Sequence, residues 1–502
     1  MVPPLSPAAA AAVSSSVHPV ESGQDLASVL PPEVYRTCLQ AFGYETLRPH
    51  QQAVLGEVFA GRDCLAVLPT GSGKSLCYAL PALVRDGLVL VVSPLIALIR
   101  DQARRFALNG IPCAAFDSLQ SADEKALVWQ HLARGELKLL IVSPERLARA
   151  DFRARLKALP LQLVAIDEAH CVSHWGNHFR PDYRLIGHYL ADFGAVQKLA
   201  VTATATRRVR DDIEQALRLR SPAQIWAEVA RTNLRLKIVK TEKVAAHYTL
   251  LLQTVLHEEG SGIVYVQTRK QAREVHRLLV DAGIAAEVYH AGLPPASREA
   301  AQRAFMAGTA RVVVATNSFG LGIDKADIRF VHHASLPASI EQYVQEIGRA
   351  GRDGLEAHCT LIYGSRDFHI QKFMIDKSFP DLTLLIEVLA VAREFIGGGV
   401  GESPLALTKH LRSVLAVTEE ELAAALEVLC REGLLARLTG SGGYGDYSEV
   451  LIGDGYCEDE AAILRDYPLR KGESMAKLEA MKVYAAATSE QRRFLLDEYF
   501  RR

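Results

Sequence analysis

The chain lacks long apolar runs, and this excludes one large class of protein. Hydrophobic residues make up 49% of its 502 positions, yet no run reaches the roughly 18 residues that a membrane-spanning helix needs. Residues 1–16 are rich in alanine, proline and serine and hold no lysine or arginine, whereas a secretory signal begins with basic residues. We therefore predict a disordered tail over residues 1–24 and no membrane partner.

Closely paired cysteines are also absent. The eight cysteines are scattered, without any C-x-x-C spacing, and zinc sites and disulfide frameworks depend on such pairs. We expect no zinc, and expect most of the thiols to be small buried side chains of a reducing compartment.

An excess of charge of either sign is missing too. The net charge is −1, so a polyanion would have to be met by positive charge gathered locally. Charge balance thus neither favours nor excludes a nucleic-acid partner.

Apolar segments of strand length alternate with helical stretches in two successive series. This alternation predicts an α/β fold in which two parallel sheets carry helices on both faces. The expected strands of the first lobe lie at residues 64–67, 88–92, 139–142, 163–166 and 198–202, and those of the second lobe at residues 262–266, 286–289, 311–315, 330–333 and 359–362.

The pattern changes after residue 366. Two expected helices are followed by two expected strands around a glycine-rich loop, which is the order of a winged helix, and an amphipathic helical stretch ends the chain. These segments are residues 404–414, 418–430, 434–438, 449–452 and 474–500. The predicted domains are the tail (1–24), the first lobe (25–207), the second lobe (208–365) and a winged-helix-like and helical C-terminal region (366–502).

A glycine-rich turn, residues 68–75, connects the first expected strand to a helical stretch. It consists of Leu68-Pro69-Thr70-Gly71-Ser72-Gly73-Lys74-Ser75. Backbone N–H groups converge at such a turn and the helix dipole adds positive charge, so the turn can bind an anion. Lys74 would reach the β- and γ-phosphates of a nucleotide, and the Ser75 hydroxyl would bind Mg²⁺. Because Leu68 stands where the general pattern has glycine, this stretch alone could also be an ordinary strand-to-helix turn.

Two adjacent carboxylates, Asp167 and Glu168, follow the strand expected at residues 163–166. Ligands of an open parallel sheet bind beyond the carboxyl ends of its strands, so these carboxylates and the phosphate loop are predicted to meet. Asp167 would hold Mg²⁺, and Glu168 would orient and deprotonate the attacking water. An acidic helix cap is the alternative.

The segment from Gln345 to Gly354 contains Arg349 and Arg352, three positions apart. On a helical turn both guanidinium groups would point to one side, towards the first lobe, as an arginine finger worth about 10³ to 10⁵ in turnover rate. A pair of solvated surface arginines is the alternative, but it does not explain the neighbouring glycines, which let the backbone approach closely.

Taken in order, these motifs resemble those of the RecQ family of superfamily-two DNA helicases. The resemblance covers about residues 42–367 and implies two RecA-like lobes. Leu68 agrees with the family's version of the phosphate loop. The resemblance is carried by that loop, by segment 345–354 and by Phe42-Gly43-Tyr44, Arg48-Pro49-His50-Gln51, Val92-Ser93-Pro94-Leu95, Asp167-Glu168-Ala169-His170, Thr202-Ala203-Thr204-Ala205-Thr206 and Ala315-Thr316-Asn317-Ser318-Phe319-Gly320-Leu321-Gly322.

The resemblance implies a role for each matching residue. Tyr44 would stack on adenine while Arg48 and Gln51 recognise its edge, which makes ATP the expected nucleotide. Gln345 would lie near the γ-phosphate, with Arg349 and Arg352 as the finger and its support. The nucleotide-binding set is completed by Thr70, Gly71, Ser72, Gly73, Lys74 and Ser75.

Aromatic and basic residues are interleaved shortly after the acidic pair, at Trp175, Phe179 and Arg180. This stretch resembles the aromatic-rich loop of the RecQ family and suits single-stranded DNA, because stacking contributes about 1 to 3 kcal/mol per base. Aromatic residues that simply fill a gap are the alternative. Asn177 and His178 replace the family's usual His-Asp pair. The coupling of DNA contact to ATP hydrolysis could therefore be weaker, or could depend on other residues.

The C-terminal region departs further from the family, which commonly carries a four-cysteine zinc module after the second lobe. No such set exists here. Residues 477–500 resemble the helical end of that module, with Gln491 in the place of a cysteine, and we infer a zinc-free remnant held by packing. Tyr444, on the expected wing, is a candidate wedge at a duplex fork; a surface tyrosine is an equal alternative.

The sequence as a whole is thus interpreted as an ATP- and Mg²⁺-dependent 3′–5′ DNA helicase of recombination and repair, acting on single-stranded and forked DNA. We expect it in the cytoplasm, nucleoid-associated if bacterial. Phosphate contacts predict salt-dependent binding that is indifferent to base sequence. Two alternatives stay open: an RNA-remodelling helicase, and an ATP-gated DNA-binding or annealing scaffold with DNA-stimulated ATPase but little unwinding.

Overall fold

The computed structural model describes most of the chain, in two compact units that meet in sequence between Arg231 and Thr232; residues 493–501 belong to the first unit. The expected tail, Tyr44, Asn177, His178 and Tyr444 lie outside the described residues. Among the helices that are described, none is both long and apolar enough to cross a bilayer. The described residues are 39, 46–94, 96–175, 179–227, 231–320, 323, 325–397, 404–437, 450–451 and 460–501.

The first unit is built on a seven-stranded parallel sheet with the strand order β3-β4-β2-β5-β6-β1-β7. All five strands expected from the sequence form, two of them one or two residues longer than predicted. The strands are β1 (Cys64–Val67), β2 (Leu88–Val92), β3 (Cys113–Phe116), β4 (Leu139–Val142), β5 (Leu161–Ile166), β6 (Gln197–Thr202) and β7 (Ala223–Trp226).

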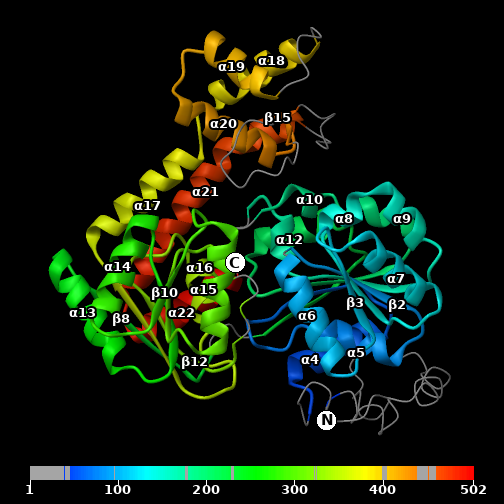
Figure 1. Ribbon diagram of the computed structural model, residues 1–502, viewed down its shortest axis with the longest axis horizontal. Helices are drawn as coiled ribbons and strands as arrows, with labels where there is room; N and C mark the ends of the chain where they lie inside the picture. Colours follow the sequence, from blue (N-terminus) through cyan, green and yellow to red (C-terminus); the bar gives the residue numbers. More distant parts are fainter. Residues whose placement is uncertain are drawn as a thin grey trace. The chain divides into compact units, whose positions relative to one another are not determined.

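Both faces of this sheet are covered, which explains why its central strands are mainly apolar. Along β1, Leu65 and Val67 enter one buried cluster while Cys64 and Ala66 enter the other. Helices α4, α5 and α6 pack on the second of these clusters (Figure 1). The helices of this unit are α4 (Pro49–Phe59), α5 (Leu76–Val84), α6 (Ile96–Leu108), α7 (Ala122–Ala133), α8 (Pro144–Ala148), α9 (Ala150–Leu156), α10 (Pro181–Arg184), α11 (Ile186–Leu190) and α12 (Arg207–Ala216), with 3₁₀ turns η1 (Ala169–Val172) and η2 (Ala191–Phe193).

The predicted boundary between the lobes, at residues 207 and 208, lies inside the first unit. Strand β7 pairs with β1, and the unit extends to Arg231. The sequence did not indicate β7 because its side chains alternate between half-buried and exposed, which leaves no apolar run.

The second unit contains a six-stranded parallel sheet with the order β10-β11-β9-β12-β13-β8. All five expected strands are present, and β8 is additional. The elements are β8 (Leu234–Lys240), α13 (Val244–His257), β9 (Ser261–Tyr265), α14 (Arg269–Asp281), β10 (Ala286–Tyr289), α15 (Pro295–Ala307), β11 (Val312–Ala315), β12 (Ile328–His333), α16 (Ile340–Ile347) and β13 (Ala357–Tyr363).

The C-terminal helices belong to the second unit up to residue 492. The expected winged-helix order is present, with Thr418 capping α20 and β14 pairing antiparallel with β15. The single helical stretch expected at residues 474–500 is instead two helices, the first of which begins at Glu460. The elements are α17 (Ser365–Ser378), α18 (Leu382–Gly397), α19 (Pro404–Val414), α20 (Glu419–Arg431), β14 (Ala436–Arg437), β15 (Val450–Leu451), α21 (Glu460–Ala486) and α22 (Ser489–Arg501).

Helix α21 connects the C-terminal region to the second sheet. At one end, Tyr467 is part of the apolar cluster formed by α18, α19 and α20. At the other, the Tyr484 ring lies 5.8 Å from the ring of Tyr343 on α16, and Lys477 pairs with Glu341 at 3.4 Å. Packing along one helix thus makes the C-terminal region continuous with the second lobe.

Candidate nucleotide site and nucleic-acid interface

The phosphate loop leaves the carboxyl end of β1 and enters α5. Gly71 and Gly73 have φ angles of +79° and +82°, in the left-handed region that side chains other than glycine disfavour. The N–H of Leu68 donates to the Thr202 carbonyl at 2.8 Å, which fixes the loop to the end of β6. The Lys74 ammonium group donates to the Leu68 carbonyl at 3.3 Å, so the lysine is held over its own loop.

The start of α4 supports the loop from outside. Arg48 donates to the Gly71 carbonyl at 3.0 Å, and the buried Gln51 amide donates to the carbonyls of Ser72 and Gly73 at 3.1 and 3.3 Å. These bonds engage the carbonyl oxygens, which would otherwise repel a phosphate. Arg48 and Gln51 thus contact the phosphate loop in this structure, and their recognition of adenine stays a prediction.

The acidic turn, residues 167–170, follows β5 and carries backbone strain. Glu168 has a φ of +47°, a left-handed conformation that is costly for a residue with a side chain and is common at functional sites. Asp167 accepts hydrogen bonds from the Glu168 N–H at 2.9 Å and from the Gln102 amide at 3.2 Å. The Tyr183 hydroxyl donates to the Asp167 carbonyl at 3.1 Å.

His170 links this turn to the neighbouring strand. Its Nδ1 lies 3.3 Å from a carboxylate oxygen of Glu168 and 2.8 Å from the Thr202 hydroxyl. Because β6 stands between β5 and β1 in the sheet, Thr202 touches both the acidic turn and the phosphate loop. The structure therefore brings the two predicted motifs together at one sheet edge.

Burial shifts the pKa values of two side chains at this sheet edge. Asp167 is buried, which raises its pKa to about 6; the negative charge of Glu168 adds to the rise, and Lys74 opposes it. Burial lowers the pKa of His170, so the imidazole favours its neutral form.

The side chains at this edge fit a magnesium ion. Mg²⁺ prefers oxygen donors and is usually held by one or two carboxylates together with substrate phosphates and water, which Asp167 and the Ser75 hydroxyl suit. Within the described part of the chain, no group of three or more His, Cys, Asp or Glu side chains is arranged to hold a metal. Such a group is not needed by an ion that the nucleotide completes.

The finger turn, residues 348–354, follows α16 in the second lobe. Helix α16 ends at Ile347 with Gly348 as its cap, so Arg349 and Arg352 lie in a turn instead of on the helical turn that the sequence predicted. The buried Arg349 guanidinium donates to the Gly320 carbonyl. Gly320 has a φ of +144°, and an added Cβ would lie 2.5 Å from the Arg349 Cζ, so glycine is required there.

Two polar side chains of this lobe are buried near the finger turn. Gln345 is buried on α16, and the buried Nε of Arg349 has no hydrogen-bond partner among the described residues. Contact of either side chain with a phosphate stays a prediction.

The aromatic loop contacts its own lobe at each predicted DNA-binding residue. The Trp175 ring packs against the first core cluster, with the Arg208 guanidinium 3.2 Å from its centroid. Phe179 stacks on His174 at 3.9 Å, and Arg180 donates to the Pro94 carbonyl. These contacts attach the loop to the acidic turn's surroundings, and DNA contact by these residues stays a prediction.

Sequence reasoning missed the side chains that support the site. Gln102, Tyr183 and Arg208 come from three different helices. The only signal at the first of these is a polar residue on an otherwise buried helix face, which does not identify its partner.

Comparisons with known proteins agree with this geometry. The DEAD/DEAH box helicase family matches residues 48–213, and the helicase conserved C-terminal domain matches residues 242–354. The chain is 42% identical to the ATP-dependent DNA helicase RecQ of Pasteurella multocida over 338 residues, which are 67% of this chain and 53% of that protein. It is 36% identical to the probable ATP-dependent DNA helicase RecS of Bacillus subtilis over 393 residues, 76% of this chain and 79% of that protein.

A solved structure shares the fold. The helicase Lhr of Mycobacterium smegmatis, bound to single-stranded DNA and AMP-PNP, matches with a TM-score of 0.55 at 19% identity, over 86% of this chain and 61% of that one. The chain spans about half the length of the RecQ proteins that it matches, at 53% and 54% for the first two. Its two sheets, its ordered motifs and its identity to these relatives agree: the chain belongs to the RecQ family of ATP-dependent DNA helicases.

Proposed function

We propose that the chain is an ATP- and Mg²⁺-dependent 3′–5′ DNA helicase that couples ATP hydrolysis to translocation on single-stranded DNA and to duplex unwinding. The observation that carries the proposal is the sheet edge where the phosphate loop, the acidic turn and Thr202 meet. The direction of movement and a place in recombination and repair rest on family membership.

The residues of the first lobe divide the work of hydrolysis. Lys74 holds the β- and γ-phosphates, while Ser75 and Asp167 hold the metal, which neutralises charge on the phosphates when bound. Glu168 orients the water and takes its proton. His170, between Glu168 and Thr202, transmits the position of the acidic turn to β6.

The second lobe supplies charge stabilisation. Arg349 and Arg352 act on the negative charge that develops during phosphoryl transfer, which is the role of an arginine finger. Gln345, on α16 and four positions before Arg349, contacts the γ-phosphate. Tyr44 stacks on adenine, with Arg48 and Gln51 at its edge.

Single-stranded DNA is the proposed track. Trp175, Phe179 and Arg180 follow the acidic turn closely in sequence. Stacking of a base on these residues therefore changes the position of Glu168 through the short backbone segment that connects them. Phosphate contacts make binding salt-dependent and indifferent to sequence. Tyr444, outside the described residues, is proposed as a wedge at the fork.

Unwinding assays on forked, 3′-tailed and 5′-tailed duplexes test the function. We expect ATP-dependent strand separation of the forked and 3′-tailed substrates, little with the 5′ tail, and none with Lys74→Ala. ATP hydrolysis that DNA stimulates, without any strand separation, would favour the alternative of an ATP-gated DNA-binding or annealing scaffold. Stimulation by RNA and not by DNA would favour the RNA-remodelling alternative.

A further inference from the structure

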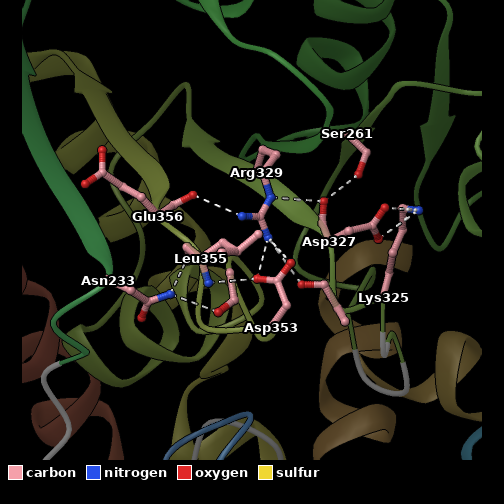
Figure 2. Close-up of polar contacts among 10 residues, drawn as sticks. Asn233, Ser261, Lys325, Asp327, Arg329, Asp353, Leu355 and Glu356 are labelled. Atoms are coloured by element: carbon pink, nitrogen blue, oxygen red, sulfur yellow. Dashed lines mark hydrogen bonds and ion pairs between the residues drawn. The ribbon is translucent and has the colours of Figure 1, made fainter.

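Arg329, on β12, binds the two ends of one short segment of the second lobe. Its guanidinium contacts both carboxylate oxygens of Asp353, at 2.6 and 2.7 Å, and donates to the Glu356 carbonyl at 3.1 Å (Figure 2). The same group donates to the Asp327 carbonyl at 3.3 Å. One arginine therefore fixes the end of the finger turn to the start of β12.

Asn233 binds the same segment from another strand. Its amide nitrogen donates to the Gly351 carbonyl at 2.9 Å and to the Leu355 carbonyl at 2.7 Å (Figure 2). Its own carbonyl accepts from the Ala357 N–H at 3.0 Å. Asn233 stands just before β8, at the second residue of this unit, and is thus held against the turn that carries Arg349 and Arg352.

Two glycines make room for these side chains. Gly351 has a φ of +56°, and a Cβ there would lie 2.6 Å from the Asn233 amide nitrogen. Gly260 has a φ of +75°, and a Cβ there would lie 2.6 Å from the Arg329 Cγ. Both contacts require glycine, so the close fit around the finger turn involves backbone as well as side chains.

The backbone of the turn is bonded to β12 as well. The Gly351 N–H donates to the Ile328 carbonyl at 2.8 Å, and the Asp353 N–H donates to the Ala326 carbonyl at 3.3 Å. Arg352 lies between these two anchored residues. Its backbone therefore lies between contacts to β12 and to the turn that precedes β12.

We propose that Arg329 and Asn233 are positioning residues that hold the finger turn in its working conformation. This inference rests on the proposed function, in which Arg349 and Arg352 act on the transferred phosphoryl group. All three guanidinium nitrogens of Arg329 are engaged, Nη2 by the Asp353 carboxylate and Nη1 and Nε by two carbonyls, so the planar group fixes orientation as well as distance. A displacement of about 1 Å at a reacting group can cost about 10²-fold in rate. Neither residue touches the nucleotide, so both act on turnover and not on nucleotide affinity.

The test compares DNA-stimulated hydrolysis by the full chain carrying Arg329→Gln or Asn233→Asp. The second change is nearly isosteric but removes the donor to both carbonyls. We expect kcat to fall by about 10-fold to 10²-fold, with little change in KM for ATP, in the affinity for a fluorescent ATP analogue, or in the melting temperature. Arg329→Lys, which keeps the charge but cannot reach Asp353 and the two carbonyls with a planar set of donors, should restore only part of the loss.

Arg235→Gln is the matched control. Arg235 lies on β8 and pairs with the Glu356 side chain at 2.7 Å, but both partners are more than half exposed, whereas Arg329 and Asp353 are about a quarter exposed. Exposed pairs contribute about 0 to 1 kcal/mol, so this variant should keep the wild-type kcat.

A second measurement separates positioning from a general effect on folding. In an Arg349→Lys background, Arg329→Gln should cause a smaller loss than in the wild-type chain, because one of the two arginines that it positions has already been replaced. Full additivity, or wild-type kcat in both Arg329→Gln and Asn233→Asp, would overturn the inference. Absence of DNA-stimulated hydrolysis in the wild-type chain would instead overturn the proposed function.

Discussion

The two lobes build their parts of the site in different ways. In the first lobe the groups come from short continuous motifs at the carboxyl ends of β1, β5 and β6, and side chains such as Gln102, 65 positions from Asp167, support them. In the second lobe the finger turn is held by side chains distant in sequence, with Asn233 separated from Gly351 by 118 positions. Under the proposed function, we expect substitutions in the first lobe to change nucleotide binding and substitutions in the finger turn to change the rate of hydrolysis.

Replacing Arg349 should give the largest difference between an effect on hydrolysis and an effect on nucleotide binding. Arg349→Lys keeps the charge but loses the planar donor set that phosphate oxygens require, so we expect DNA-stimulated kcat to fall by about 10³-fold or more. Binding of a fluorescent ATP analogue should hardly change. Single-turnover hydrolysis and equilibrium binding, measured on the same preparation, check both expectations.

Lys74→Ala provides the opposite case. It removes a phosphate contact from the first lobe, so analogue binding and hydrolysis should both be lost. If Arg349→Lys also abolished analogue binding, the division between the lobes would be wrong.

The sequence predicted the central strands and the motif residues because both are local signals. Strands buried on two faces are mainly apolar runs, and all ten strands expected in the two lobes formed. The three strands that were missed, β3, β7 and β8, are all edge strands. Strands β7 and β8 mix polar with apolar residues and are half-buried or exposed, so they lack the apolar run on which the prediction depended. Strand β3 is apolar but has only four residues, three of them small and half-buried.

The side chains that hold the finger turn could not be predicted from the sequence, for a different reason than the missed strands. Arg329 and Asn233 are ordinary polar residues in sequence, and their importance comes from partners that only the folded sheet brings close. The two helices at the C-terminal end were merged for a related reason, because the amphipathic pattern continues across the short break between α21 and α22.

Trp175→Ala should produce a smaller effect that links the first lobe to DNA. We expect hydrolysis without DNA to stay largely unchanged and its stimulation by single-stranded DNA to be lost, since stacking on one base contributes about 1 to 3 kcal/mol. ATPase rates measured across a DNA titration check this. Unchanged stimulation would contradict a DNA-sensing role for the aromatic loop.

Trp129→Ala is the matched control. Trp129 also packs against the first core cluster and lies under an arginine, with the Arg155 guanidinium 4.2 Å from its ring. It is on α7, away from the acidic turn. If both tryptophan variants lost DNA stimulation equally, the loss would reflect core packing.

The smallest expected effect is a pH dependence confined to the first lobe. A carboxyl must be deprotonated to hold Mg²⁺, and the pKa of Asp167 is raised to about 6, so hydrolysis should fall as the pH drops through about 6, by about tenfold per pH unit at low Mg²⁺. Because the ion competes with the proton, high Mg²⁺ should move the midpoint of the pH profile to lower pH.

Asp182→Asn is the control for this pH profile. Burial also raises the pKa of Asp182 to about 6, but this variant should leave the midpoint unchanged. A midpoint that ignores the Mg²⁺ concentration would mean that Asp167 does not hold the ion.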